Sequence, residues 1–321
     1  MRLSLVIPTL NGMPLLEQVL DAVERQPGAD ARERVAVDSG STDGTVDCLR
    51  AHGFAVTSIP KREFNHGATR DVAIGKTSGD VIVLLTQDAI PADDAWLPSL
   101  AAVYTDPEVG AAYCRQLPRE DCNPFIARRL REWTAGKTEP AVQQPARADE
   151  FEQLEPMQRL QRCAYDNVAG SVRRTAWEQH PFGWRRFGED VAFGKRLILG
   201  GYRIVFQPAS TVIHSHNRTP RAEGKRIYCD HANLKDLFGV HLVPTWTKFR
   251  ENVRWARAHY AAEVGKLELE GPAEAKLLEW ARGYAWWSAV GMYLGGNADR
   301  MQRGWRAPLM GCVDRWMRKG I

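Results

Sequence analysis

The sequence predicts an α/β protein with a mostly parallel central sheet flanked by helices, followed by a helical C-terminal region. Three observations support this prediction. Short apolar runs alternate with stretches of helical periodicity through the first 116 residues. The run at 81–85 contains only Val, Ile and Leu, which is typical of a strand covered on both faces. From residue 222 onward the pattern is helical and rich in Trp and Arg.

The first elements follow one another closely, as in a parallel α/β sheet. The turn Ser39-Gly40-Ser41-Thr42-Asp43-Gly44 offers side chains that cap the helix after it. In chain order we expect a strand at 3–7, a helix at 15–25, a strand at 34–37, a helix at 45–52, and strands at 54–59, 81–85 and 111–114.

The alternation of strands and helices stops at residues 118–158, a polar segment with five prolines. We expect a variable loop region with short helices there. After it we expect a strand at 167–172, a helix at 189–199, and two strands, at 204–206 and 211–216, separated by Pro208. We therefore predict two domains, an α/β domain at 1–216 and a helical region at 217–321.

The net charge of +4 is unevenly distributed, because residues 1–216 carry −3 and residues 217–321 carry +7. Such a basic region suits an anionic membrane surface or an anionic substrate better than duplex DNA. Basic helices with Trp can lie in a membrane interface, but they can equally form a bundle against the α/β domain or a second subunit. The basic residues of the last segment are Arg300, Arg303, Arg306, Arg315, Arg318 and Lys319, with Trp305 and Trp316 among them.

Composition excludes several classes of protein. With 44% hydrophobic and 26% charged residues, the chain is neither disordered nor collagen-like nor a disulfide scaffold. No two of the six cysteines have C-x-x-C spacing, which disfavours a zinc or redox motif. The longest uncharged stretch, 283–298, has 16 residues with four glycines, short of the ~20 apolar residues of a spanning helix. We expect a cytoplasmic protein with reduced thiols, and a peripheral position on the inner face of the membrane is compatible with this.

Polar residues follow four of the expected strands, where ligands bind in an open parallel sheet. Carboxylates and amides there can hold a base, a ribose or a metal, and glycine allows close backbone approach. Each turn alone is better explained as an ordinary turn with a helix cap, but their coincidence at the strand ends favours a nucleotide site. The absence of G-x-G-x-x-G and of the P-loop motif argues against a dinucleotide or P-loop enzyme. The strand ends carry Pro8, Thr9 and Asn11, then Asp38 and Ser39, then Asn65 and Gly67, and then Gln87 and Asp88.

Two pairs of motifs carry a family resemblance over roughly residues 3–240. Val6-Ile7-Pro8-Thr9-Leu10-Asn11-Gly12 and Val37-Asp38-Ser39-Gly40-Ser41-Thr42-Asp43-Gly44-Thr45 resemble the opening of the family 2 glycosyltransferases, which have the GT-A fold. Phe64-Asn65-His66-Gly67-Ala68-Thr69-Arg70-Asp71 and Leu85-Thr86-Gln87-Asp88-Ala89-Ile90-Pro91 more narrowly resemble the bacterial dTDP-rhamnosyltransferase branch.

The resemblance implies a nucleotide-sugar site in which Asp38 accepts a hydrogen bond from the base or ribose. It places Arg70 on the diphosphate, although a structural pair of Arg70 with Asp71 or another carboxylate is an equal alternative. Thr86 stands where the family's Asp-x-Asp element usually has its first Asp, so the metal shell lacks one carboxylate. The implied donor-binding residues are Pro8, Thr9, Asn11, Asp38, Ser39, Gly67, Arg70, Gln87 and Asp88.

Phe187-Gly188-Glu189-Asp190 resembles the Glu-Asp motif of the family, whose Asp is the catalytic base. Asp190 would take the proton from the acceptor hydroxyl, and Glu189 would orient Asp190 or bind the acceptor. The alternative is two ordinary first-turn acids stabilised by a helix dipole. Strand alternation places His214 and His216 on one face, and with Asp88 they are the candidate ligands of Mg²⁺ or Mn²⁺.

The segment Asn167-Val168-Ala169-Gly170-Ser171-Val172-Arg173-Arg174 resembles the strand and turn that border the acceptor in the family, which implies an acceptor near Gly170 and Ser171. Trp184 is a further candidate for the acceptor side, because its ring could stack on a sugar. Packing roles are the alternative for these residues. The absence of Gln-x-x-Arg-Trp after Asp190 favours addition of single sugars over processive synthesis.

These features together predict an inverting glycosyltransferase that moves L-rhamnose from dTDP-rhamnose to a surface-glycan or polyprenyl-linked acceptor, with no nucleic acid polymer as partner. A UDP- or GDP-hexose donor and a catalytically inactive nucleotide- or glycan-binding module remain alternatives, and Thr86 is the feature in favour of the inactive module. The sequence leaves membrane contact and homo-oligomer formation open.

Overall fold

The computed structural model describes residues 1–28, 33–301 and 307–320 of the chain. It divides into two compact units, Met1–Asn217 and Arg218–Ile321. Arg303, Trp305 and Arg306 of the basic C-terminal segment lie outside the described residues.

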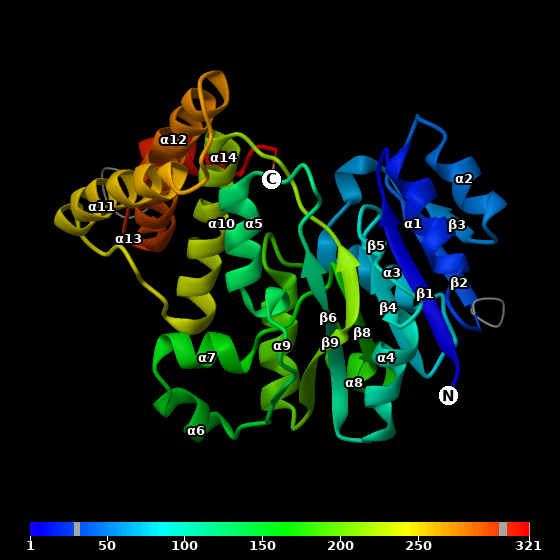
Figure 1. Ribbon diagram of the computed structural model, residues 1–321. Helices are drawn as coiled ribbons and strands as arrows, with labels where there is room; N and C mark the ends of the chain where they lie inside the picture. Colours follow the sequence, from blue (N-terminus) through cyan, green and yellow to red (C-terminus); the bar gives the residue numbers. More distant parts are fainter. Residues whose placement is uncertain (29–32, 302–306, 321) are drawn as a thin grey trace. The chain divides into compact units, whose positions relative to one another are not determined.

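The first unit is built on one sheet whose strand order is β3-β2-β1-β4-β8-β6-β9-β5, with β7 paired to β9 (Figure 1). The strands are β1 (Leu3–Thr9), β2 (Glu33–Asp38), β3 (Ala55–Ser58), β4 (Val81–Leu85), β5 (Ile90–Pro91), β6 (Val109–Leu117), β7 (Ala141–Gln143), β8 (Ala169–Arg173) and β9 (Arg203–Ile213).

The sheet is mixed but mostly parallel, which confirms the predicted fold class. Strands β1 to β4 are mutually parallel. Strand β8 is antiparallel to both β4 and β6, so β6 and its parallel neighbour β9 run in the direction of β4. Because six strands share one direction, their carboxyl ends meet at one edge, where the amino end of β8 also lies.

The helices of this unit follow the strands along the chain and pack around the sheet. The apolar positions of α1 and α4 pack with Leu5, Ile7 and Val83 in one buried core cluster. The helices are α1 (Leu15–Glu24), α2 (Thr45–Ala51), α3 (His66–Ile74), α4 (Trp96–Ala102), α5 (Pro124–Glu132), α6 (Ala148–Gln153), α7 (Pro156–Arg162), α8 (Arg174–Gln179) and α9 (Glu189–Leu199). The segment 118–158 contains the short helices that we expected, and in addition the edge strand β7.

The expectation of two strands around Pro208 is wrong, because β9 is one strand from Arg203 to Ile213. Its register against β6 shifts between the pairs Cys114–Gln207 and Arg115–Thr211. The extra residues of this irregularity include Pro208, which needs no ladder hydrogen bond there. The strand ends before His214, so both histidines lie in the segment that leaves the sheet edge.

The second unit is helical, as predicted. Helices α10 and α12 approach closely through glycines: a Cβ added to Gly291 would lie 2.4 Å from the carbonyl oxygen of Gly224. None of the helices in the described ranges has the length and apolar character needed to cross a bilayer. The helices are α10 (Pro220–Phe238), α11 (Trp246–Gly265), α12 (Pro272–Gly296), α13 (Ala298–Met301) and α14 (Ala307–Arg318).

Candidate active site

The turns after β1 and β2 are held together by Asp38, whose side chain is 2% exposed. Its carboxylate accepts hydrogen bonds from the hydroxyl of Thr9 at 3.1 Å and from the backbone nitrogen of Ser41 at 2.9 Å. The buried Ser39 hydroxyl donates to the Thr9 carbonyl, and Asn11, at φ +47°, accepts from the nitrogen of Thr42. The structure therefore brings Thr9, Asn11, Asp38 and Ser39 together.

Pro8 and Gln87 flank this group. Pro8 pairs with Val37 near the end of β1. The side-chain amide of Gln87, just after β4, accepts from the nitrogen of Leu10 at 2.8 Å and donates to its carbonyl oxygen at 3.0 Å. Gln87 thus fixes the turn after β1 against the end of β4.

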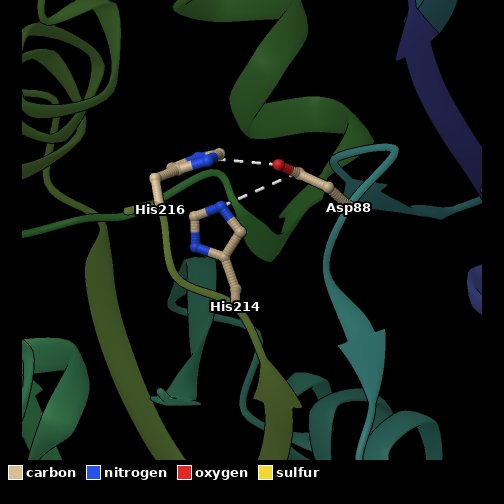
Figure 2. Close-up of side chains that lie close together, drawn as sticks. All are labelled: Asp88, His214 and His216. Atoms are coloured by element: carbon tan, nitrogen blue, oxygen red, sulfur yellow. Dashed lines mark ion pairs between the residues drawn. The ribbon is translucent and has the colours of Figure 1, made fainter. Parts of the chain in front are cut away.

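Asp88, His214 and His216 converge beside this edge (Figure 2). Nε2 of His214 lies 3.7 Å from one oxygen of Asp88, and Nε2 of His216 lies 3.5 Å from the other. The two imidazole rings meet edge to face, with centroids 4.8 Å apart. Three side chains that could ligate a metal thus lie together, although Asp88 is more than 120 positions from the two histidines in the sequence.

The second nitrogen of His214 is fixed by a relay that the sequence analysis missed. Nδ1 of His214 lies 3.0 Å from Oε1 of Gln116, and the amide nitrogen of Gln116 donates to Asp166 at 2.8 Å. Because an amide oxygen only accepts, Nδ1 carries the proton, and Nε2 is the nitrogen that faces Asp88. Metal-ligating histidines are oriented in this way. The signal in the sequence that could have pointed to the relay is Gln116 itself, a glutamine near the end of an expected strand. The structure shows that its side chain is buried at the end of β6.

Arg119, just after β6, joins the two segments that carry the cluster. Its backbone nitrogen donates to the hydroxyl of Ser215 at 3.0 Å, and its guanidinium donates to the carbonyl oxygen of Asp88. The loop that bears Asp88 and the segment that bears both histidines are therefore held by one residue.

Glu189 and Asp190 occupy the first turn of α9 and differ in their surroundings. Glu189 is buried and accepts from the guanidinium of Arg70 at 3.2 Å and from the amide of Asn167 at 3.0 Å. Burial tends to raise the pKa of the Glu189 carboxyl, but the charges of Arg70 and His66 and the Asn167 hydrogen bond outweigh it and lower the pKa. Asp190 is only half-buried. Of the two acids, Asp190 is the one that is accessible to a substrate.

Arg70 is therefore paired with a carboxylate, which was the alternative to a contact with the diphosphate. The carboxylate belongs to Glu189 rather than to Asp71. Asp71 instead accepts hydrogen bonds from the indole nitrogen of Trp177 at 2.7 Å and from the backbone nitrogens of Phe182 and Gly183. Contact of Arg70 with a diphosphate stays a prediction.

The segment before α9 is tied to α3. A Cβ added to Gly67 would lie 2.2 Å from the carbonyl oxygen of Gly183, so Gly67 serves this close approach. The side chain of Asn65 also donates to the carbonyl of Arg185 at 2.7 Å. Between these two contacts Trp184 is 70% exposed, so its ring is available to a ligand.

The structure does not bring Gly170 and Ser171 to the site. Ser171 is fully buried and accepts from the hydroxyl of Tyr104, and a Cβ on Gly170 would lie 2.8 Å from the carbonyl oxygen of Asp166. Both residues lie within β8, which runs opposite to β4 with Leu85 paired to Ala169, so a role of either residue in binding an acceptor stays a prediction. The residues of this segment near the site are Asp166 and Asn167.

Comparison with known proteins places this geometry in a family. The family model described as glycosyl transferase family 2 matches residues 4–169. The chain is 33% identical over 236 residues to the O-antigen chain rhamnosyltransferase RfbN of Salmonella typhimurium, covering 71% of each chain. It is 30% identical over 233 residues to the O-antigen chain rhamnosyltransferase WbaN of Salmonella anatum, covering 70% of each.

Solved structures support the fold. TarS of S. aureus (residues 1–349) superposes with a TM-score of 0.52 at 13% identity, covering 99% of this chain and 80% of the other. Glucosyl-3-phosphoglycerate synthase of Mycobacterium tuberculosis, solved with Mn²⁺, UDP and glucosyl-3-phosphoglycerate, gives 0.52 at 20% identity, covering 74% and 80%. These neighbours share the GT-A architecture that the sequence predicted. The family match over half of the chain and the two relatives show that this chain is a glycosyltransferase and belongs to glycosyl transferase family 2.

Proposed function

We propose that the protein is an inverting rhamnosyltransferase, which moves L-rhamnose from dTDP-rhamnose to a hydroxyl of a growing surface glycan or its polyprenyl-linked precursor. The observation that carries the proposal is the convergence of Asp88, His214 and His216 at the sheet edge that also bears the Asp38 turn. The names of the two Salmonella relatives, O-antigen chain rhamnosyltransferases, support the choice of sugar and acceptor.

The Asp88 cluster fits a divalent cation. The ring of His214 is oriented by Gln116 so that Nε2 faces the Asp88 carboxylate at 3.7 Å, and a cation between these two atoms would be bound by both. When bound, Mn²⁺ or Mg²⁺ would neutralise charge on the leaving diphosphate. The structural neighbour solved with Mn²⁺ and UDP supports a metal of this kind. Asp38, fixed by the turn after β2, would accept a hydrogen bond from the base or ribose of the donor.

Asp190 would act on the acceptor. The acceptor oxygen forms a bond to the anomeric carbon as the bond from that carbon to the diphosphate oxygen breaks, and the hydroxyl proton goes to the Asp190 carboxylate. Glu189, held by Arg70 and Asn167, fixes the first turn of α9 from which Asp190 projects. Trp184, largely exposed before α9, offers a face on which an acceptor sugar can stack.

The first experiment compares binding of dTDP, UDP and GDP, each with and without Mn²⁺, by calorimetry, and turnover of dTDP-rhamnose by wild type and Asp190→Asn. We expect metal-dependent preference for dTDP, and a variant that binds donor like wild type but loses transfer by a factor of about 10²–10⁴. Preference for UDP or GDP would keep the enzyme class and reject rhamnose. Turnover by Asp190→Asn at the wild-type rate would reject Asp190 as the base. Donor binding by the wild-type protein without any turnover would favour an inactive binding module.

A further inference from the structure

A groove of about 850 Å³ lies on the C-terminal unit, along α11 and beside α12. Its apolar part consists of Trp246, Phe249 and Val253 from α11 and Trp286 from α12. The ring of Trp246 stacks on Phe249 with centroids 4.7 Å apart, and Trp286 meets Phe249 edge to face at 5.5 Å. Although these rings pack on one another, Trp246 is 57% exposed and Trp286 is 41% exposed. The groove therefore leaves indole surface open to solvent.

Three arginines, Arg250, Arg254 and Arg257, line the same groove, and no lining residue is acidic. Their i, i+4, i+7 spacing places them along one face of α11 as neighbours, where like charges repel. All three are exposed, and within the described part of the chain no hydrogen bond or ion pair reaches their guanidinium groups.

The acidic residues of α11 do not offset these arginines, because both are paired elsewhere. Glu251 lies 2.9 Å from the ammonium of Lys248, and Glu263 lies 2.7 Å from that of Lys266. The groove thus combines an uncompensated row of positive charge with exposed indole rings, a combination suited to an amphipathic, anionic partner.

We propose that this groove docks the C-terminal unit on an anionic phospholipid surface, with the arginines at the lipid phosphates and Trp246 and Trp286 at the interface. Arginine forks match phosphate oxygens, and indole rings favour the boundary between headgroups and acyl chains. Charge complementarity selects this occupant over a second copy of the chain, since a symmetric contact would set this row of arginines against itself. The proposal goes beyond the glycosyltransferase activity and does not rest on it.

The test is flotation of the full-length protein with vesicles of equimolar phosphatidylglycerol and phosphatidylcholine. The variant combines Arg250→Gln, Arg254→Gln and Arg257→Gln. The matched control combines Lys276→Gln, Arg315→Gln and Lys319→Gln, which removes the same charge from exposed residues of the same unit outside the groove. Since each basic residue near an anionic surface contributes roughly a fivefold factor, we expect the groove variant to bind on the order of 100-fold more weakly. The control should keep most of the wild-type binding.

Four outcomes would overturn the proposal. Equal loss in both triple variants would assign the binding to the net charge of the unit. Wild type that binds these vesicles no better than pure phosphatidylcholine would reject the anionic surface. If wild type is a dimer in size-exclusion chromatography and the groove variant is a monomer, the groove binds a second copy of the chain. If wild type binds a single-stranded oligonucleotide more tightly than the vesicles, and the groove variant loses this binding, the groove binds nucleic acid.

Discussion

The imidazole of His214 can bind a cation only through Nε2, because Gln116 occupies Nδ1 and is itself held by Asp166. Neither Gln116 nor Asp166 needs to touch the ion. Their effect is to keep Nδ1 turned toward Gln116 and the ring in one orientation, which leaves Nε2 directed at Asp88.

Replacing Gln116 by Leu removes this hydrogen bond while keeping a side chain of similar size in β6. We expect the affinity for Mn²⁺ to fall about 10- to 100-fold, the range typical of lost outer-shell partners. Calorimetric titration with Mn²⁺ in the presence of nucleoside diphosphate measures it. Gln143→Leu is the matched control, because Gln143 bonds to Tyr113 and Ala164 instead. Equal affinities of Gln116→Leu and wild type would show that the relay does not orient a ligand.

At the scale of elements, α3 and α9 are joined by the buried pair of Arg70 and Glu189 and by the close approach of Gly67 to Gly183. Arg70 is 2% exposed and Glu189 is 7% exposed. These contacts fix the start of α9, and with it Asp190, relative to the sheet edge.

Glu189→Gln leaves the Arg70 guanidinium buried without its charge partner. We expect the free energy of unfolding to fall by about 3–5 kcal/mol, as when other buried pairs lose one partner. Urea unfolding monitored by circular dichroism measures this loss. The control is Asp149→Asn, which breaks the exposed Arg147–Asp149 pair and should cost under about 1 kcal/mol. A loss from Glu189→Gln no larger than that of the control would mean that the pair does not hold the helix.

The elements of the parallel half could be predicted because their apolar runs and turn residues are local features. The run 81–85 forms β4 over Val81–Leu85, and the predicted helix at 189–199 is α9. The direction of β8 could not be predicted in this way, since a strand has the same alternation whichever way it runs. That direction decides that Asn167, and not Ser171, reaches the site.

At the scale of the whole molecule, the site depends on contacts between distant segments. Gln116, Asp166 and His214 lie far apart in sequence and meet only because β6 is placed between β8 and β9. The resemblance of the motifs to a known family brought Asp88 and His214 together in the prediction, whereas the Gln116 relay required the strand order. The helical character of the second unit was likewise predictable, but its groove depends on how α11 and α12 pack.

The second unit should lose stability in mild acid because of His231 in α10. The side chain of His231 is 9% exposed, and burial, with a further contribution from His241, lowers its pKa from 6.5 to about 4. The unfolded chain binds this proton more readily than the folded chain, so the stabilisation is complete above pH 6.5 and is lost as the pH falls toward 4. A difference of this size corresponds to about 3 kcal/mol.

Urea unfolding of the full-length protein between pH 7 and pH 4 tests this prediction, with the change in unfolding free energy compared between wild type and His231→Gln. The substitution removes the titrating group, so the variant should lose about 3 kcal/mol less than wild type over this range. Asn233→Ser, at a buried residue of the same helix, removes no titrating group and should keep the wild-type slope. If His231→Gln instead shows the same slope as wild type, the acid sensitivity belongs to other groups, and the buried imidazole of α10 is not what limits the stability of this unit.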